Sequence, residues 1–433
     1  MGRTLEITPA RRFGGTPGLP GDKSISHRAL LLGALARGRS EVRGLATGWD
    51  VVATREALVR LGVRIDRPDE DTVIIVGVGG AAHLREPEEP LPCLNSGTTA
   101  RLLAGVVAGL PGLTVLSGDA SLRRRPMARV IEPLRETGAR VWGRGGDQFL
   151  PLCIQGRNPL RPVSYRLPVA SAQVKSALLL AALAAEGVST IEEPVVTRDH
   201  TETMLRAAGV GCARSGSLLT VTGPAVPEPI DLRVPADPSA AAAFAVGAAI
   251  HAGSEVIMRG ICLNPTRTAW LDLLREMGAG VEVLAEGGRG GEPVGTVRVT
   301  GRGLRGVTVG AGQVPGLIDE LPVLAVAMAM AEGPSRVEGA GELRRKESDR
   351  IRSLAEELGK FGLAMEETAE GFALPGGGRP VAPPWSDPHG DHRIAMALAM
   401  LGTAATGTTL LREAQCLDIS FPGFEPVLRQ MTG

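Results

Sequence analysis

Glycines, hydroxyl side chains and cations gather at the start of several apolar segments of this 433-residue chain. Each segment predicts a buried helix, and the first turn of a helix has unpaired N–H groups and a positive dipole end. Such helix starts are suited to bind phosphate or carboxylate groups. The residues are Asp22, Lys23, Ser24, Ser26 and Arg28 in the first segment, Asn95, Ser96, Gly97, Thr98 and Arg101 in the second, Ser171, Gln173 and Lys175 in the third, and His389, Asp391, His392 and Arg393 in the last.

One such segment opens with carboxylates instead. Asp319 and Glu320 would repel an anion there, so Asp319 is a candidate base. A further charged segment, ELRRKESDRIRSL, puts Lys346 and Arg350 on one helix face, with Glu347 between them in sequence. The chain has only four lysines against 43 arginines, and three of the four lie in these segments. Their placement indicates sites that require a compact ammonium group.

The apolar segments are copies of one pattern. The pattern begins at residues 21, 95, 170, 235, 316 and 389 and consists of a polar turn followed by a helix rich in Ala, Leu and Met. Amphipathic helices such as VVATREALVRLGVRI, and β-type runs such as TVIIVGV, LLTVTG and TVRVTG, lie between the copies. Unless frequent alanine alone explains the similarity, a two-helix unit is repeated six times. We therefore predict an α/β protein with two cores of three units each.

The composition excludes several classes of protein. Lys+Arg and Asp+Glu both number 47, which does not indicate a polybasic nucleic-acid binder. The longest strongly apolar stretch, residues 240–250, is too short to span a membrane. The N-terminal MGRTLEITPARRFGG lacks the apolar core of a signal peptide. Five cysteines without a CxxC pattern favour a reducing, cytoplasmic location.

Three other motifs are incomplete. GRGLRG at residue 301 has the form of a dinucleotide-binding loop, but VTVGAG follows it instead of a helix. GLPGDKS resembles a P-loop, but Asp22 interrupts the pattern. The HGDH segment could offer His389, Asp391 and His392 to a metal, but no other His or Cys cluster completes a site. We predict neither a cofactor nor a metal site.

A series of motifs gives the chain a resemblance to a known family. In order along the sequence, they are PGDKSISHRALLLGALA, NSGTTARLL, RRRPM, SAQVKSALLLAAL, TRDHTETML, LNPTRT, LIDELPVLAVAMA, LRRKESDRI and GDHRIAMALAM. The chain resembles the 5-enolpyruvylshikimate-3-phosphate synthases of the enolpyruvyl transferase family. The resemblance implies two similar α/β domains, each an inside-out barrel of three βαβαββ units with buried helices. Residues 20–234 would form one domain, and residues 1–19 with 235–433 the other, with the active site in the cleft between them.

The resemblance also implies a reaction. The enolpyruvyl (1-carboxyvinyl) group of phosphoenolpyruvate is transferred to the 5-hydroxyl of shikimate 3-phosphate, the sixth step of chorismate and aromatic amino acid biosynthesis. Addition gives a tetrahedral intermediate, and elimination releases phosphate. The family implies a monomer without a cofactor that binds small-molecule substrates and neither nucleic acid nor membrane. Glyphosate, which is similar to phosphoenolpyruvate, would compete for its site next to Gly97.

The resemblance assigns site residues by motif position. The expected contacts of shikimate 3-phosphate are Lys23, Ser24, Arg28, Ser171, Ala172, Gln173, Arg198, Asp319 and Lys346. The expected contacts of phosphoenolpyruvate are Lys23, Gly97, Arg125, Gln173, Arg350 and Arg393. Asp319 is the expected base, and Glu347 or Lys23 the acid that protonates C3 of phosphoenolpyruvate. Neighbouring cations favour the ionised form of a carboxyl group, so the identity of the acid stays open.

One position departs from the family pattern, and two other functions stay open. Where one bacterial branch has a lysine, CLDISFPGF has Ile419, so one expected cation is missing or replaced. A UDP-N-acetylglucosamine enolpyruvyl transferase would carry a reactive loop cysteine, and neither Cys93 nor Cys153 lies in a matching context. A non-catalytic anion-binding protein would not need Asp319 and Glu347 among cations.

Overall fold

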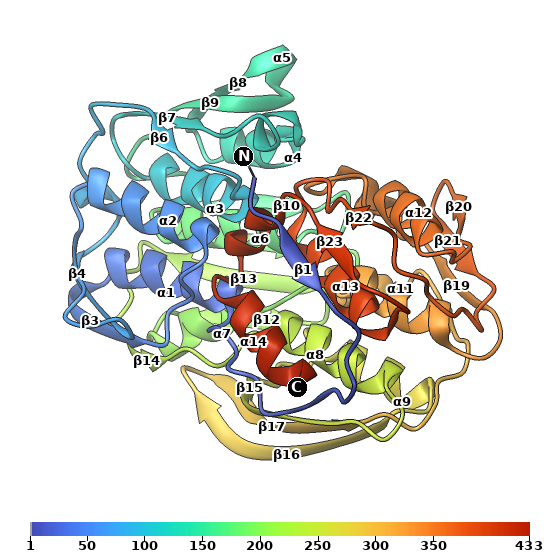
Figure 1. Ribbon diagram of the computed structural model, residues 1–433. Coiled ribbons are helices and arrows are strands. Elements are labelled where there is room, and N and C mark those ends of the chain that lie inside the picture. The colour runs from blue at the N-terminus through green and yellow to red at the C-terminus, as the bar shows by residue number, and fades with distance from the viewer. Residues whose placement is uncertain (1) are drawn as a thin grey trace. The chain divides into compact units, whose positions relative to one another are not determined.

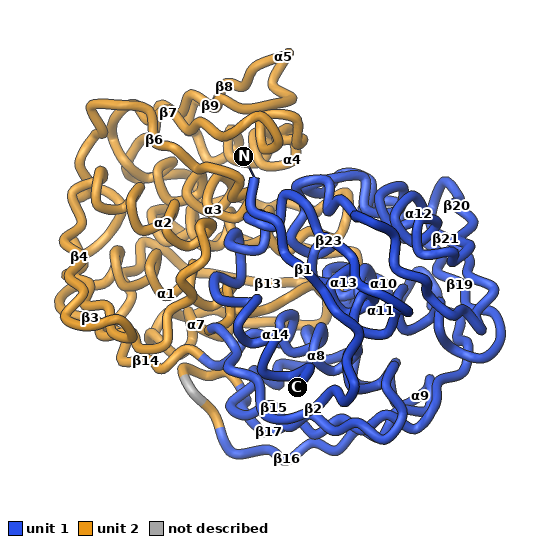
Figure 2. The backbone as a smooth tube through the Cα atoms, in the orientation of Figure 1, with its two compact units in different colours: residues 1–20, 235–287, 293–433 blue, residues 21–234, 288–292 orange. Residues whose placement is uncertain are grey.

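The repeated pattern of the sequence folds into two compact units, each built from three small sheets around three buried helices (Figures 1 and 2). The computed structural model describes residues 2–433, apart from the side chain of Arg289. Unit 1 contains the chain up to Pro20 with residues 235–287 and 293–433, and unit 2 contains residues 21–234 and 288–292. Each unit therefore has its own core.

Unit 2 follows the order of the first three repeats. Its helices are α1 (Lys23–Leu35), α2 (Trp49–Arg60), α3 (Gly97–Ala108), α4 (Ala128–Glu136), α5 (Arg144–Asp147), α6 (Ala172–Ala182) and α7 (His200–Ala207). Its strands are β3 (Arg37–Arg43), β4 (Arg64–Asp66), β5 (Thr72–Val78), β6 (Leu91–Pro92), β7 (Leu113–Ser117), β8 (Arg140–Gly143), β9 (Phe149–Gln155), β10 (Ser164–Arg166), β11 (Gly187–Glu192), β12 (Cys212–Ser215), β13 (Leu218–Gly223) and β14 (Asp231–Arg233).

The three sheets of unit 2 have the same topology. Their strand orders are β14-β3-β5-β4, β6-β7-β9-β8 and β10-β11-β13-β12. In each sheet the first pair is parallel and the other two pairs are antiparallel. In the first sheet, for example, Glu41 lies opposite Asp231 on one side and Ile74 on the other. One strand pattern thus repeats three times, as the sequence predicts.

Unit 1 follows the order of the last three repeats. Its helices are α8 (Pro238–Ile250), α9 (Ala269–Glu276), α10 (Val314–Leu317), α11 (Leu321–Met330), α12 (Arg350–Lys360), α13 (His392–Ala404) and α14 (Phe424–Thr432). Its strands are β1 (Leu5–Ile7), β2 (Gly14–Gly15), β15 (Glu255–Cys262), β16 (Gly280–Arg289), β17 (Glu292–Thr300), β18 (Thr308–Val309), β19 (Ser335–Glu338), β20 (Glu366–Thr368), β21 (Gly371–Leu374), β22 (Trp385–Ser386) and β23 (Thr409–Leu411). The turn of the β16–β17 hairpin, residues 288–292, groups with unit 2.

The sheets of unit 1 repeat the same scheme with one truncation. Two of them have the orders β16-β17-β15-β2 and β18-β19-β21-β20. The third, β1-β23-β22, has three strands, and its β1 comes from the N-terminal end of the chain. Short 3-10 helices, η1 (Ala81–His83) and η2 (Leu122–Arg124) in unit 2 and η3 (Gly341–Arg345) and η4 (Ala414–Ile419) in unit 1, complete the elements.

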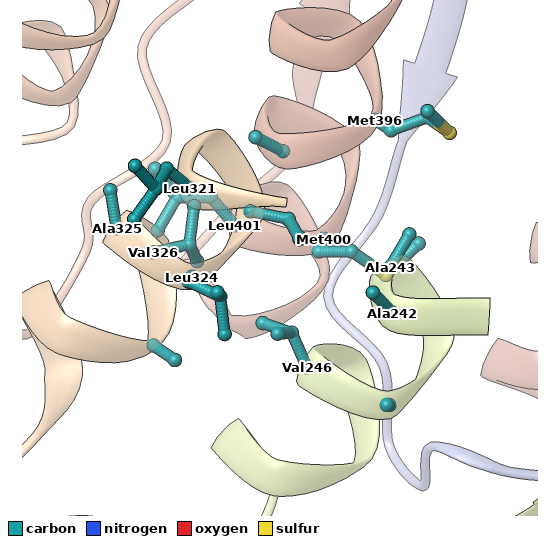
Figure 3. Close-up of a cluster of buried hydrophobic side chains, with 14 of the residues drawn as sticks. Ala242, Ala243, Val246, Leu321, Leu324, Ala325, Val326, Met396, Met400 and Leu401 are labelled. Carbon is teal, nitrogen blue, oxygen red and sulfur yellow. The ribbon is translucent and has the colours of Figure 1, made fainter. Parts of the chain in front are cut away.

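The core of unit 1 is formed by α8, α11 and α13 (Figure 3). Every residue of α8 from Pro238 to Ala249 is buried, because the helix is apolar on all faces and has no polar face to expose to solvent. Val246, Leu324 and Met400 are among the side chains that point toward one another from these three helices. Small alanines let the helices approach closely and leave the remaining space to larger side chains.

The same close packing holds α3 against α6 in unit 2. A Cβ atom at Gly105 would lie 2.1 Å from the carbonyl oxygen of Ala177, so only glycine fits at this helix crossing.

Among the residues described, no helix is long and apolar enough to cross a membrane. The predicted runs TVIIVGV and LLTVTG form β5 and β13 with unchanged bounds. The predicted fifth apolar helix, by contrast, begins at Leu321, because Ile318 to Glu320 separate it from the short α10.

Candidate active site

The start of α1 in unit 2 is held by two carboxylates. The side chain of Asp22 caps the helix and accepts a hydrogen bond from the N–H of Ile25 at 2.8 Å. The next residue, Lys23, donates from Nζ to Oδ2 of Asp50 at 2.9 Å. Thr99 of α3 donates to the carbonyl oxygen of Asp50 at 3.1 Å. Asp50 therefore joins the starts of α1 and α3.

Arg28 connects α1 to two other elements. Its guanidinium donates to Thr201 of α7 at 2.6 Å, to Ser176 of α6 at 2.7 Å and to the carbonyl oxygen of Ser24 at 2.8 Å. Burial lowers the pKa of Arg28 to about 10, and the charge of the nearby Arg198 also lowers it. Arg28 stays protonated at neutral pH, and two of its five N–H groups remain beyond these three bonds.

The start of α3 presents two guanidinium groups around a glycine. Ser96 caps the helix by accepting a hydrogen bond from the N–H of Thr99 at 3.0 Å. A Cβ atom at Gly97 would lie 2.8 Å from Nη1 of Arg101 and 3.3 Å from Nη1 of Arg125. Glycine is thus needed for both cations to lie this close to the helix start.

Gln173 joins the start of α6 to the start of α3. Its Oε1 accepts a hydrogen bond from Arg101 at 2.6 Å, and its Nε2 donates to Thr98 at 3.0 Å. Ser171 caps α6 by accepting from the N–H of Val174 at 3.4 Å. The predicted residues Ser171, Ala172 and Gln173 therefore lie together in the first turn of α6, and the starts of α1, α3 and α6 meet.

Lys175 is the exception, and its assignment as an anion-binding cation is wrong. The side chain is fully buried and pairs with Glu193 at 3.1 Å and Glu202 at 2.8 Å. Its Nζ also donates to the carbonyl oxygen of Thr197 at 3.3 Å. Lys175 lies one turn further along α6 than Ser171. At this depth its side chain is buried in the core of unit 2 and does not reach the cluster of helix starts. Its charge is compensated inside unit 2.

Arg350 is the centre of the charged cluster of unit 1. It is 1 % exposed and donates to Asp391 at 2.8 Å, to Glu347 at 2.7 Å and to Asp319 at 3.3 Å. Burial by itself lowers the pKa of Arg350, but the charges of Asp391, Glu347 and Asp319 outweigh it and raise the pKa above its ordinary value. Lys346 reaches Asp319 at 3.9 Å. The predicted residues of unit 1 therefore lie together.

Arg393 enters this cluster through Asp391. The carboxylate of Asp391 accepts a hydrogen bond from the backbone N–H of Arg393 at 2.8 Å and caps α13. The metal alternative for this segment does not fit, because Asp391 is bound to Arg350 and Nε2 of His389 lies 3.0 Å from Oε1 of Glu357. Two of the three residues that the alternative requires, His389 and Asp391, are thus engaged with protein groups.

Two further residues bear on the alternatives. Burial raises the pKa of the Cys93 thiol to about 12, so this cysteine is not an activated nucleophile. Ile419 is 5 % exposed and belongs to the apolar core of unit 1. The missing lysine is thus replaced by a packing residue.

Sequence reasoning overlooked Asp50, because an acidic residue in the first turn of an amphipathic helix is usual.

The fold and the site define a class of α/β enzymes with two units of repeated topology. The helix starts of unit 2 carry cations, and unit 1 holds carboxylates beside a buried arginine. A family model described as EPSP synthase (3-phosphoshikimate 1-carboxyvinyltransferase) matches residues 7–428. The chain belongs to this family. The predictions of family, fold class, enzyme class and activity are confirmed by this match and by those below.

Relatives and solved structures agree over nearly the whole chain. The 3-phosphoshikimate 1-carboxyvinyltransferase of Desulforamulus reducens is 44% identical over 427 residues, which cover 99% of both chains. That of Gloeobacter violaceus is 47% identical over 425 residues, 98% of both chains. The structure of EPSP synthase from Acinetobacter baumannii superposes with a TM-score of 0.87 at 39% identity and covers 99% of this chain and 98% of that one. These matches do not favour the UDP-N-acetylglucosamine alternative.

Proposed function

We propose that this chain transfers the 1-carboxyvinyl group of phosphoenolpyruvate to the 5-hydroxyl of shikimate 3-phosphate and releases phosphate. The observation that carries the proposal is the junction of three helix starts in unit 2, where the positive ends of the helices adjoin Lys23, Arg101 and Arg125. The two substrates together carry two phosphates of about −1.5 to −2 charges each. Charge-assisted hydrogen bonds from such cations are the strong contacts that these groups require.

Shikimate 3-phosphate would be held mainly by unit 2. Lys23 and Ser24 begin α1, and Arg28 follows one turn later with N–H groups to spare. The other proposed contacts on unit 2 are Ser171, Ala172, Gln173 and Arg198, and those on unit 1 are Asp319 and Lys346. The phosphate and hydroxyl groups of the substrate would accept hydrogen bonds from the cations and hydroxyl groups of this set.

Phosphoenolpyruvate would be held by arginines of both units. Gly97, Arg125 and Gln173, with Lys23, are the proposed contacts on unit 2, and Arg350 and Arg393 those on unit 1. Because the pKa of Arg350 is raised, its guanidinium stays charged at every pH at which the substrate is ionised. A planar guanidinium suits both the carboxylate and the phosphate of this substrate.

Asp319 is the proposed base. It accepts the proton of the 5-hydroxyl while the oxygen forms a bond to C2 of phosphoenolpyruvate, and an acid gives a proton to C3. The tetrahedral adduct then loses phosphate from C2 and a proton from C3, which restores the double bond. Glu347 is ion-paired with Arg350 at 2.7 Å, and this contact favours its ionised form, which has no proton to give. The arrangement favours Lys23 as the acid.

The two compact units are the proposed domains, with chain crossings near Pro20 and Val234. We also propose that the enzyme is a monomer that works in a reducing cytoplasm, where the free thiols of Cys93, Cys153, Cys212 and Cys416 are stable.

Phosphate release from phosphoenolpyruvate tests the proposal. We expect release when shikimate 3-phosphate is the acceptor and none when UDP-N-acetylglucosamine replaces it. Release with the second acceptor alone would contradict the proposed acceptor. Binding of both phosphorylated acids without any release would support a non-catalytic anion-binding protein instead.

A further inference from the structure

Glu357 is a buried carboxylate two turns beyond Arg350 on α12. Its side chain is fully buried, and in that position an ionised carboxylate requires compensation. No contact proposed for either substrate involves this residue. Its burial therefore calls for another explanation, and the identity of its partners supplies one.

Three groups surround the carboxylate of Glu357. Lys360, on the same helix, donates to Oε1 at 2.7 Å. Nε2 of His389 lies 3.0 Å from Oε1, and the backbone N–H of Asp387 donates to Oε2 at 3.0 Å. The second and third groups belong to residues 387–391, the loop between β22 and α13. Glu357 thus binds this loop at two points.

The loop leads directly into the charged cluster. His389 has φ = 53°, a left-handed conformation that is unfavourable for a residue with a side chain. The Oδ1 atom of Asp387 accepts a hydrogen bond from the N–H of His389 at 2.7 Å and helps to hold this conformation. Two residues later, Asp391 caps α13 and binds Arg350. The turn at His389 therefore determines where Asp391 lies.

We propose that Glu357 is a positioning residue, which holds the 387–391 loop so that Asp391 and Arg393 are correctly placed against Arg350. The inference rests on the proposed function, in which Arg350 and Arg393 bind phosphoenolpyruvate. Arg350 and Glu357 belong to one helix, α12, so the distance between them is fixed. The loop that Glu357 holds is therefore placed relative to Arg350. Loss of the contact to the loop changes the spacing of the two arginines and weakens binding of this substrate more than binding of the other.

The contact between Glu357 and His389 also gives the site a pH dependence. His389 faces Glu357 and, at 3.8 Å, Glu356. Hydrogen bonding to Glu357 raises the pKa of His389 above its ordinary value. Burial raises the pKa of Glu357, but hydrogen bonds from His389 and Lys360 outweigh it and lower the pKa overall.

Two cations lie over the ring of Trp385, next to the loop. Nζ of Lys360, which binds Glu357, lies 4.2 Å from the centre of this ring, and the guanidinium of Arg412 lies 4.3 Å from it. Because the pKa of His389 is raised, its ionic contact with Glu357 is complete below the ordinary histidine pKa and is lost as the pH rises through the raised value. The loop is held most firmly in the protonated state.

Two variants test the inference. Glu357→Gln keeps the shape of the side chain and removes its charge. We expect the KM for phosphoenolpyruvate to rise about tenfold, equivalent to about 1.4 kcal/mol. The KM for shikimate 3-phosphate should change by less than about twofold. His389→Gln keeps a neutral donor, and we expect it to abolish the rise in this KM that the unaltered enzyme shows between about pH 5.5 and about pH 8.5. Glu366→Gln, the same change at an exposed glutamate of β20 in unit 1, is the matched control and should change neither KM.

Hydrogen exchange of the amides in residues 387–393 gives a readout that does not depend on turnover. We expect faster exchange in Glu357→Gln and no change in Glu366→Gln. Unchanged exchange, or an equal rise in both KM values, would overturn the inference. If the unaltered enzyme failed to release phosphate, the proposed function would fail, and the exchange result would still decide whether Glu357 holds the loop. If Glu357→Gln does not fold, the pH profile of His389→Gln decides.

Discussion

Replacement of Gly97 by alanine tests how closely the site is fitted to its small substrate. The added methyl group would lie 2.8 Å from Nη1 of Arg101 and 3.3 Å from Nη1 of Arg125. The nearer nitrogen cannot move without cost, because it donates to Gln173 at 2.6 Å. Arg125 is similarly held by Asn95 at 2.5 Å. The methyl group therefore displaces groups that are proposed to bind phosphoenolpyruvate.

The size of the effect follows from these hydrogen bonds. A hydrogen bond to a charged group contributes about 1.5–3 kcal/mol, and a displacement of a few tenths of an ångström weakens it without abolishing it. A loss of about 1.4 kcal/mol corresponds to a tenfold change in affinity. We expect the Gly97→Ala variant to have an approximately tenfold higher KM for phosphoenolpyruvate by this arithmetic. Inhibition by glyphosate should weaken at least as much, because we expect this inhibitor to compete for the same space.

Steady-state assays of phosphate release, with and without glyphosate, measure both effects. Gly211→Ala is the matched control in unit 2, because an added Cβ atom there meets nothing within 4 Å. Its kinetic constants should equal those of the unaltered enzyme. Equal inhibition of Gly97→Ala and the unaltered enzyme by glyphosate would refute the steric reasoning. An equal rise in the KM for both substrates would show a general disturbance of α3 instead.

Three other changes probe different parts of the structure. Lys175→Met removes the fully buried cation of Glu193 and Glu202 and leaves them the partly exposed Arg214, which pairs with them at 2.5 and 3.0 Å. We therefore expect it to lower the free energy of unfolding by about 3 kcal/mol, the lower end of the cost of breaking a buried pair, while the KM values of the folded fraction stay unchanged. Denaturant unfolding and kinetics check this, and a selective KM effect would restore Lys175 to the site. Gly359 lies in the exposed part of α12, where an added Cβ atom meets nothing within 4 Å. Gly359→Ala should therefore stabilise the protein by about 0.4–1 kcal/mol in the same unfolding assay. A loss of stability would contradict the open packing at this position. Asp319→Asn should lower kcat by about 10²–10⁴-fold with small KM changes, as measured by phosphate release, and a change confined to KM would remove its role as base.

The fold was largely predictable because its signal is repeated. One helix that is apolar on all faces is ambiguous, but six at intervals of similar length specify a repeated unit and two cores. Strand bounds such as those of β5 follow from a short local run of β-branched side chains. The short strands β6 and β22 were not predictable, since each has two residues and depends on the neighbour with which it pairs.

The site was predictable where residue type and helix start coincide, as for Lys23 and Gln173. It was not predictable where a residue of the right type faces the core, and Lys175 illustrates this. Helical spacing gives the face on which a side chain lies but not whether solvent or a carboxylate covers that face. The partner Glu202 lies 27 positions away and reaches Lys175 only through tertiary packing. Glu357 was overlooked for the same reason.

The two units differ in the charge of their clusters, and this difference bears on their roles. In unit 2, Lys23, Arg28 and Arg101 are accompanied by Asp50, so positive charge is in excess. In unit 1, Asp391 and two other carboxylates surround Arg350, and Lys346 and Arg393 adjoin them, so three carboxylates meet three cations. An excess of positive charge attracts phosphorylated acids, whereas a balanced cluster can hold a carboxylate base beside a permanent cation without losing either charge. Unit 2 is therefore suited to collect the anions, and unit 1 to supply the proton acceptor.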